Sequence, residues 1–127
     1  MPPLPAPITR IAIYAKDMEK TLLFYQKFFG FKVIANESDQ LIELQNPGGG
    51  SGLVILPASK GHRAGQSCVK IVFDVKDVAA FRSAKLKQGL KFGAIHECDG
   101  YQYCNARDPG QNPIQISSRA YRSPGSQ

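Results

Sequence analysis

The chain opens with an alternation of apolar and polar positions that predicts a strand over residues 8–14. Ile11 and Ile13 fall on one face of this segment. The opposite face carries a mixed set, Arg10, Ala12 and Tyr14. Because successive side chains of a strand point to opposite faces, we expect the apolar face to pack in a core and the mixed face to lie elsewhere.

The pattern then changes to a helical period. Asp17 stands where a helix N-cap belongs, and Gly30 stands where the chain leaves the helix. The apolar residues between them share one helical face, namely Met18, Leu22, Tyr25 and Phe29. Three strand segments are expected next, at 31–36, 40–45 and 53–58, the last two joined by the turn sequence 46–50.

After a polar loop over 58–67 the same order begins again. Val69, Ile71, Phe73 and Val75 alternate along a strand, Asp77 can cap a second helix and Gly89 can end it. Further strands are expected at 90–97, 101–107 and 113–118, with a turn over 108–112 between the last two.

The two halves therefore read as a duplication. Asp77 follows Asp17 by 60 positions, and Gly89 follows Gly30 by 59. This predicts an α+β protein with two βαβββ modules, 8–58 and 68–118, joined by a linker over 59–67. Residues 1–7 are expected to be an extended arm, and 119–127 a flexible tail.

Composition narrows the function classes. The net charge is +6 over 127 residues, but Lys and Arg occur singly and no basic stripe with interleaved aromatics is present, so we expect no nucleic acid partner. No apolar run is long enough to span a bilayer, and the first residues lack signal-peptide chemistry. Cys68, Cys98 and Cys104 match no zinc spacing. They read as reduced thiols of a cytoplasmic protein.

Several segments carry a family resemblance. Residues 8–25 are similar to the first strand and helix of the vicinal oxygen chelate superfamily, the glyoxalase, bleomycin resistance and extradiol dioxygenase group. Phe29-Gly30-Phe31 is similar to the end of that helix. The stretch 108–114 resembles the Asp-Pro-Asp-Gly-Asn turn before the last strand of the family. The resemblance implies mixed sheets curled around a central cavity, helices outside, and a homodimer.

The resemblance also implies where a divalent metal would be held. Each module of the family supplies one ligand from its first strand, usually His, and one from its last, usually Glu. The matching positions here are Arg10 and Lys70 on the first strands and Ile55 and Gln115 on the last. Arg, Lys and Ile are poor metal ligands and two of them are cations, so we expect no metal and no other cofactor.

The mixed strand faces then suggest a cavity for a small molecule. Arg10 and Lys70 favour an anionic or aromatic guest, and the expected ligand-binding residues are Arg10, Tyr14, Glu43, Ile55, Lys70 and Gln115. In an equally weighted alternative, Arg10 pairs with Glu43, and Lys70 pairs with Asp74 or Glu97, which closes the cavity.

Four functions remain open on the sequence. The first is a metal-free protein that binds a small molecule. The second is a metal-free lyase, isomerase or dioxygenase-like enzyme with Lys70 as catalytic acid or base. The third is a metal enzyme with other ligands, drawn from Glu43, His62, His96 and Glu97. The fourth is a protein without a small ligand that acts through its dimer surface.

Overall fold

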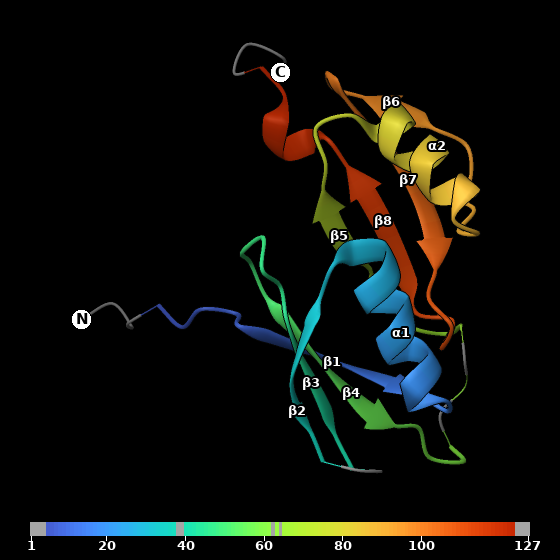
Figure 1. Ribbon diagram of the computed structural model, residues 1–127. Coiled ribbons are helices and arrows are strands. Elements are labelled where there is room, and N and C mark those ends of the chain that lie inside the picture. The colour runs from blue at the N-terminus through green and yellow to red at the C-terminus, as the bar shows by residue number, and fades with distance from the viewer. Residues whose placement is uncertain (1–4, 38–39, 62, 64, 124–127) are drawn as a thin grey trace. The chain divides into compact units, whose positions relative to one another are not determined.

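The chain folds as two compact units, residues 1–63 and 64–127, each of which holds one βαβββ module. The computed structural model describes residues 5–37, 40–61, 63 and 65–123 (Figure 1). Each unit has one four-stranded mixed sheet and one α-helix, so the predicted α+β fold with two modules is confirmed. The central cavity between the modules stays a prediction.

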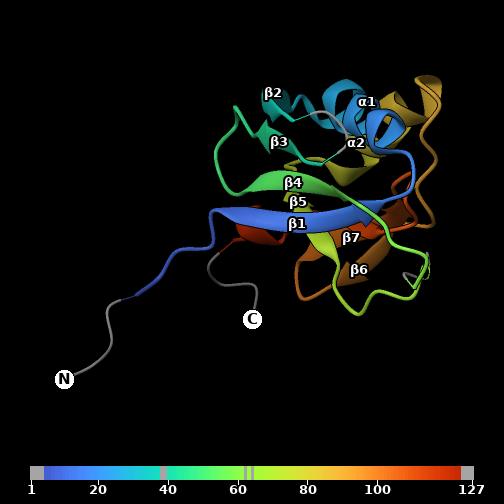
Figure 2. The same cartoon turned by 90° about the horizontal axis from the view of Figure 1, so that it is seen from below.

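The first unit has the sheet order β1-β4-β3-β2, in which β1 runs parallel to β4 and the other pairs are antiparallel. The helix α1 packs against β4 and β1 on one face of this sheet (Figure 2). The elements are β1 (Arg10–Ala15), α1 (Met18–Phe29), β2 (Lys32–Asn36), β3 (Ile42–Gln45) and β4 (Gly52–Pro57).

Local chemistry explains the bounds of α1. The Asp17 carboxylate accepts the backbone N–H of Lys20 at 2.9 Å, which caps the first turn. Gly30 has φ 71°, a left-handed conformation that ends the helix. Leu22 and Tyr25 are buried as the period predicts, and Thr21 and Phe24 join them. The core of the unit is completed by buried strand residues, namely Ile13, Ala15, Ile42, Leu44, Leu53 and Ile55.

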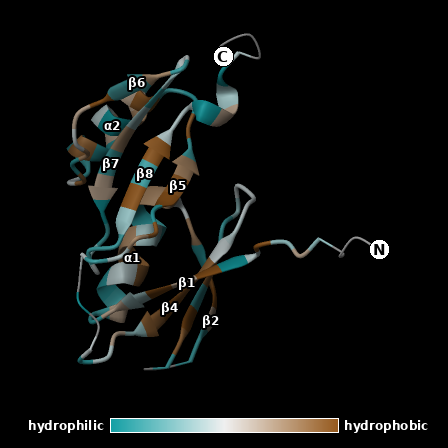
Figure 3. Cartoon of the chain, turned by 180° about the vertical axis from the view of Figure 1, so that it is seen from behind, coloured by the Kyte–Doolittle hydropathy of each residue, from teal (hydrophilic) through white to brown (hydrophobic). Residues whose placement is uncertain are grey.

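The second unit repeats the arrangement with the order β5-β8-β7-β6 and β5 parallel to β8. Asp77 caps α2 by accepting the N–H of Ala80 at 2.9 Å. Much of β5 and β8 is hydrophobic, as the brown colour of these strands shows in Figure 3. The elements are β5 (Ile71–Asp74), α2 (Val78–Lys87), β6 (His96–Cys98), β7 (Tyr101–Arg107), β8 (Pro113–Ser117) and the 3₁₀ helix η1 (Arg119–Tyr121).

Two segments differ from the sequence expectation. The strand expected over 90–97 is reduced to β6, because Leu90 and Phe92 are buried as anchors and only residues 96–98 pair with β7. The tail expected from residue 119 begins with η1, and residues 124–127 lie outside the described part of the chain. At the other end, residues 5–9 form no helix or strand, and residues 1–4 are outside the described range.

Among the described helices, none has the length and apolar character to cross a membrane.

Candidate functional site

The sheet face opposite α1 carries Arg10, Ala12 and Tyr14. Their partners in β4 are Gly52, Val54 and Leu56, and Glu43 of β3 pairs with Val54. Ile55 pairs with Ile13 on the other face and is completely buried in the core. Ile55 therefore does not share a sheet face with Arg10, Tyr14 and Glu43, although the sequence predicted it in one site with them.

Arg10 and Glu43 form an ion pair in the first unit. A guanidinium nitrogen of Arg10 lies 3.5 Å from a carboxylate oxygen of Glu43, with the two side chains 62% and 23% exposed. This is the pairing that the sequence offered as an alternative to ligand binding. The carboxylate neutralises the guanidinium, so this pair presents little net charge to an anionic molecule.

Lys70 in the second unit has a different partner. Its ammonium group donates a hydrogen bond of 3.0 Å to the Oδ1 atom of Asn105. Gln115 donates to the same oxygen through Nε2, also at 3.0 Å. The pairing of Lys70 with Asp74 or Glu97 is wrong, since the structure gives Lys70 an amide partner and Glu97 accepts from Gln102 at 2.9 Å. Within the described residues, Lys70 has no ion pair.

The register shows that these two pairs occupy equivalent places. In the first unit Glu43 is opposite Val54, and in the second Asn105 is opposite Gln115. The turn before β8 is one residue shorter than the turn before β4, and this difference moves the counterpart of Gln115 from Ile55 to Val54. Arg10–Glu43 and Lys70–Asn105 are thus matching pairs, the first with a carboxylate and the second with a neutral amide.

A groove lies on the same face of the second sheet, with a volume of about 420 Å³. Gln115 lines it and so connects it to the Lys70 network. The other lining residues that bear on its chemistry are Val72, Asp74, Tyr101, Arg119 and Arg122. Apolar walls with a few fixed polar groups are typical of small-molecule sites.

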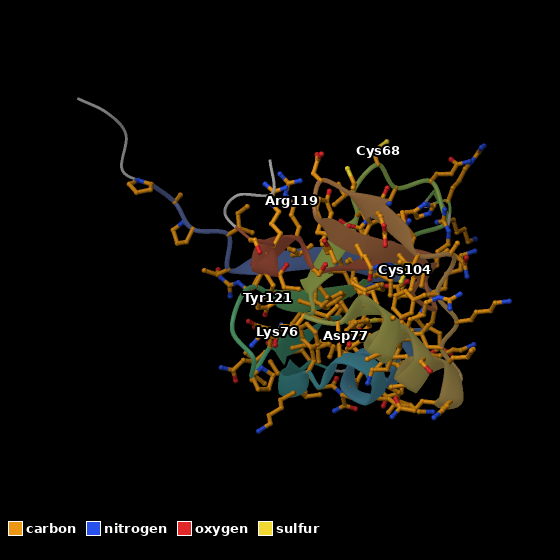
Figure 4. The ribbon with its side chains drawn as sticks, turned by 90° about the horizontal axis from the view of Figure 1, so that it is seen from above. Cys68, Lys76, Asp77, Cys104, Arg119 and Tyr121 are labelled. Carbon is orange, nitrogen blue, oxygen red and sulfur yellow. The ribbon has the colours of Figure 1, made fainter. Side chains whose placement is uncertain are left out.

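Two arginines from the C-terminal segment stand over Tyr101. The guanidinium carbons of Arg119 and Arg122 lie 5.3 and 5.8 Å from the ring centroid of Tyr101. Arg119 also donates to the Tyr101 hydroxyl oxygen at 3.3 Å. Figure 4 labels Arg119 and Tyr121, the first and last residues of η1, and the ammonium nitrogen of Lys76 lies 5.6 Å from the ring centroid of Tyr121.

The family metal does not fit the four corresponding residues. These are now Arg10, Val54, Lys70 and Gln115, a set with two cations, one alkyl side chain and one neutral amide oxygen. A divalent ion prefers neutral imidazoles and carboxylates, and a cationic side chain repels it. In the part of the chain that the structure describes, no group of three or more His, Cys, Asp or Glu is placed to hold a metal.

The other candidate ligands that the structure describes contact other side chains. His62 lies outside the described residues. His96 stacks on Tyr103 with ring centroids 5.1 Å apart, and Glu97 is held by Gln102. Glu43 pairs with Arg10. The three described residues of this open alternative therefore each already have a side-chain partner within their own unit.

The cysteines differ in environment. Cys104 is buried, as expected of a small hydrophobic side chain, whereas Cys68 and Cys98 are exposed. Burial raises the pKa of the Cys104 thiol, and the positive charge of Arg82 opposes part of that rise. A buried thiol with a raised pKa is a poor nucleophile, so Cys104 acts in packing.

Sequence reasoning missed Asn105, Arg119 and Arg122. Counting the antiparallel register back from the turn over 108–112 would have placed Asn105 opposite Gln115. No such signal marks the arginines, because their position depends on a short turn after the last strand. Residues 118 and 102 fix that turn by paired hydrogen bonds between distant parts of the sequence.

Comparisons with known proteins agree with this fold. The family model of the Glyoxalase/Bleomycin resistance protein/Dioxygenase superfamily matches residues 8–116, and the chain belongs to this superfamily. A comparison with curated proteins gives no match.

Three solved structures illustrate the structural likeness. Lactoylglutathione lyase from Agrobacterium tumefaciens is 19% identical with a TM-score of 0.73, and the match covers 90% of this chain and 94% of that one. TnmS3, an antibiotic binding protein from Streptomyces sp. CB03234, is 17% identical with a TM-score of 0.73, covering 87% and 93%. A glyoxalase/bleomycin resistance protein from the same strain is 19% identical with a TM-score of 0.66, covering 86% and 97%. At these identities the likeness shows the fold.

Proposed function

We propose that the protein binds a small anionic or aromatic compound without a metal, on the β5-β8-β7-β6 face of its second unit. The observation that carries this proposal is the pairing of Lys70 with the neutral amide of Asn105 rather than with a carboxylate. An ammonium group held in place by an amide keeps its full charge, so it attracts a carboxylate or phosphate. The ion-paired Arg10 of the first unit lacks that property.

The adjoining groove supports the proposal because it gives the body of such a compound a place to lie. Val72 and Tyr101 provide apolar and aromatic surface, and Gln115 joins this surface to Lys70. A structural neighbour, TnmS3, is an antibiotic binding protein, which is the same general class of activity on the same fold.

An exchange of Asn105 for Asp tests the proposal. Asn105→Asp places a carboxylate beside Lys70 and recreates the ion pair seen at Arg10 and Glu43. We expect it to weaken binding of biphenyl-4-carboxylate, measured by titration calorimetry, by about tenfold or more, because the charge of Lys70 is then neutralised. The reciprocal control, Glu43→Gln, should leave that affinity unchanged.

Either of two results would overturn the proposal. One is the absence of biphenyl-4-carboxylate binding by the wild-type protein. The other is an affinity that Asn105→Asp leaves intact while Glu43→Gln changes it, since the anion would then lie at Arg10.

A second candidate is a metal-free lyase or isomerase in which Lys70 moves a proton. Its support is that the ammonium group of Lys70 shares its amide partner, Asn105, with Gln115 of the groove lining. Lys70→Met separates the two functions once a substrate is found. Turnover that survives this substitution would exclude Lys70 as the acid or base.

A further inference from the structure

The C-terminal segment contributes the basic residues of the groove lining, Arg119 and Arg122, at the end away from Lys70. Ser118 donates its N–H to the carbonyl of Gln102 at 3.0 Å and accepts the N–H of Gln102 through its hydroxyl, also at 3.0 Å. The hydroxyl of Ser117 accepts the N–H of Arg119 at 3.1 Å. These bonds attach the segment to β7 and β8, so Arg119 and Arg122 are positioned by the fold.

The arginines keep their positive charge within the groove. Both stand within 6 Å of the Tyr101 ring centroid, and Asp74 is the one carboxylate among the described lining residues. No ion pair joins Asp74 to either arginine in the described residues. Taken with Lys70, the named groups of the proposed site are three cations and one carboxylate, a net formal charge of two.

The two basic ends are separated along the strand direction. Lys70 immediately precedes β5, and Asp74 at the end of β5 pairs with Ser117, just before η1. Four residues of extended chain span about 13 Å. Val72 and Gln115 lie between the two ends in the register and line the groove. Gln115 and Lys70 donate to the same oxygen of Asn105, which places Lys70 beside the groove lining.

We infer that the guest of this groove is an elongated, flat diacid, with one acidic group at Lys70 and the second at Arg119 and Arg122. This inference rests on the proposed function and adds the chemical class of the ligand. The two positive charges match two carboxylates, and the guanidinium forks suit a planar carboxylate. The ring of Tyr101 and the side chain of Val72 contact the flat body between them.

A pair of probes tests the second anchor. Biphenyl-4,4′-dicarboxylate and biphenyl-4-carboxylate share one body and differ by one acidic group. We expect the wild-type protein to bind the diacid about tenfold more tightly in calorimetric titration. Arg119→Gln and Arg122→Gln should each remove most of this preference. Lys91→Gln also removes one positive charge, but at an exposed position outside the groove lining, and this variant should keep the preference for the diacid.

The outcomes separate this inference from the proposed function. If the monoacid binds and Asn105→Asp weakens it, but the diacid gains nothing, the second anchor alone is overturned. Two further results also overturn the second anchor: a diacid preference that survives both arginine substitutions, and one that Lys91→Gln lowers as much as the arginine substitutions do. In either case the tighter binding of the diacid would come from the net charge of the protein. Circular dichroism of each variant checks folding, and if the single arginine variants unfold, the salt dependence of the wild-type preference replaces them. A preference that added salt does not reduce overturns the anchor.

Discussion

At the scale of single residues, the difference between a carboxylate and an amide separates the two modules. Glu43 and Asn105 occupy equivalent register positions, and each contacts the basic residue at the start of its sheet. The carboxylate cancels the charge of Arg10, while the amide only orients Lys70. Under the proposed function, this difference lets the second module attract an anion and the first module not.

Cys104 makes a pH-dependent contribution to stability. Burial raises its pKa, so the folded chain keeps this thiol proton at an alkaline pH where the unfolded chain has lost it. The stabilising contribution is complete below the ordinary thiol pKa and is lost as the pH rises through the raised value. We expect Cys104→Ala to lose about 1 kcal/mol near neutral pH through the void left behind, and to show a shallower alkaline decline.

Urea unfolding at a series of pH values measures both effects. Cys98→Ala is the matched control, because Cys98 is exposed, and its alkaline profile should follow that of the wild-type protein. An alkaline decline that is identical in Cys104→Ala and wild type would contradict the assignment.

At the scale of elements, the two helices begin in the same way and differ in how much they bury. Asp17 and Asp77 both cap through the N–H three residues later, at 2.9 Å. Four residues of α1 are buried, whereas only Val78 of α2 is. The first helix therefore contributes more to its core, and its cap stabilises an element on which the whole first sheet depends.

Replacement of the Asp17 cap should measurably destabilise the protein. Asp17→Ala removes the acceptor for the N–H of Lys20 and should lower the free energy of unfolding by about 1 kcal/mol. Asp17→Asn keeps an acceptor oxygen and should remain within a few tenths of wild type. Chemical denaturation compares the three proteins, and equal losses in both variants would show that the carboxylate acts through its charge rather than as a cap.

The helices and most strands followed from the sequence because caps, glycines and periods are local signals. The strand expected over 90–97 did not form over its full length. The alternation of Leu90 and Phe92 reflects burial in the core rather than strand pairing, and the ring centroids of Phe81 and Phe92 lie 6.4 Å apart. The face of β4 on which Ile55 lies was predicted wrongly because the turns before β4 and β8 differ in length by one residue. A shift of one residue along a strand moves each side chain to the opposite face of the sheet. Arg10, Lys70 and Gln115 stay predicted site residues. The side chain that Lys70 and Gln115 both contact, Asn105, could not be predicted locally because its position depends on cross-strand register.

At the scale of the whole molecule, duplication leaves each module with one helix for a sheet that has two faces. α1 packs on one face of its sheet, and the opposite face exposes Tyr14 in the first unit and Val72 in the second. A two-layer module buries its remaining apolar surface against another layer. The homodimer expected from the family resemblance stays a prediction.

Sedimentation equilibrium measures that assembly directly. We expect a mass of twice the 13.9 kDa of the single chain across a range of protein concentrations. A mass of one chain throughout that range would contradict the expected homodimer and limit any site to a single copy.

Metal content tests most directly whether this chain keeps the superfamily fold while its function proceeds without the superfamily metal. Untagged protein, purified without chelator and then equilibrated with Ni²⁺, Zn²⁺, Mn²⁺ or Fe²⁺, is dialysed and measured by elemental analysis. The residue set Arg10, Val54, Lys70 and Gln115 predicts far less than one ion per chain for every metal. One tightly held ion per chain would contradict this prediction and would favour a metal-dependent function.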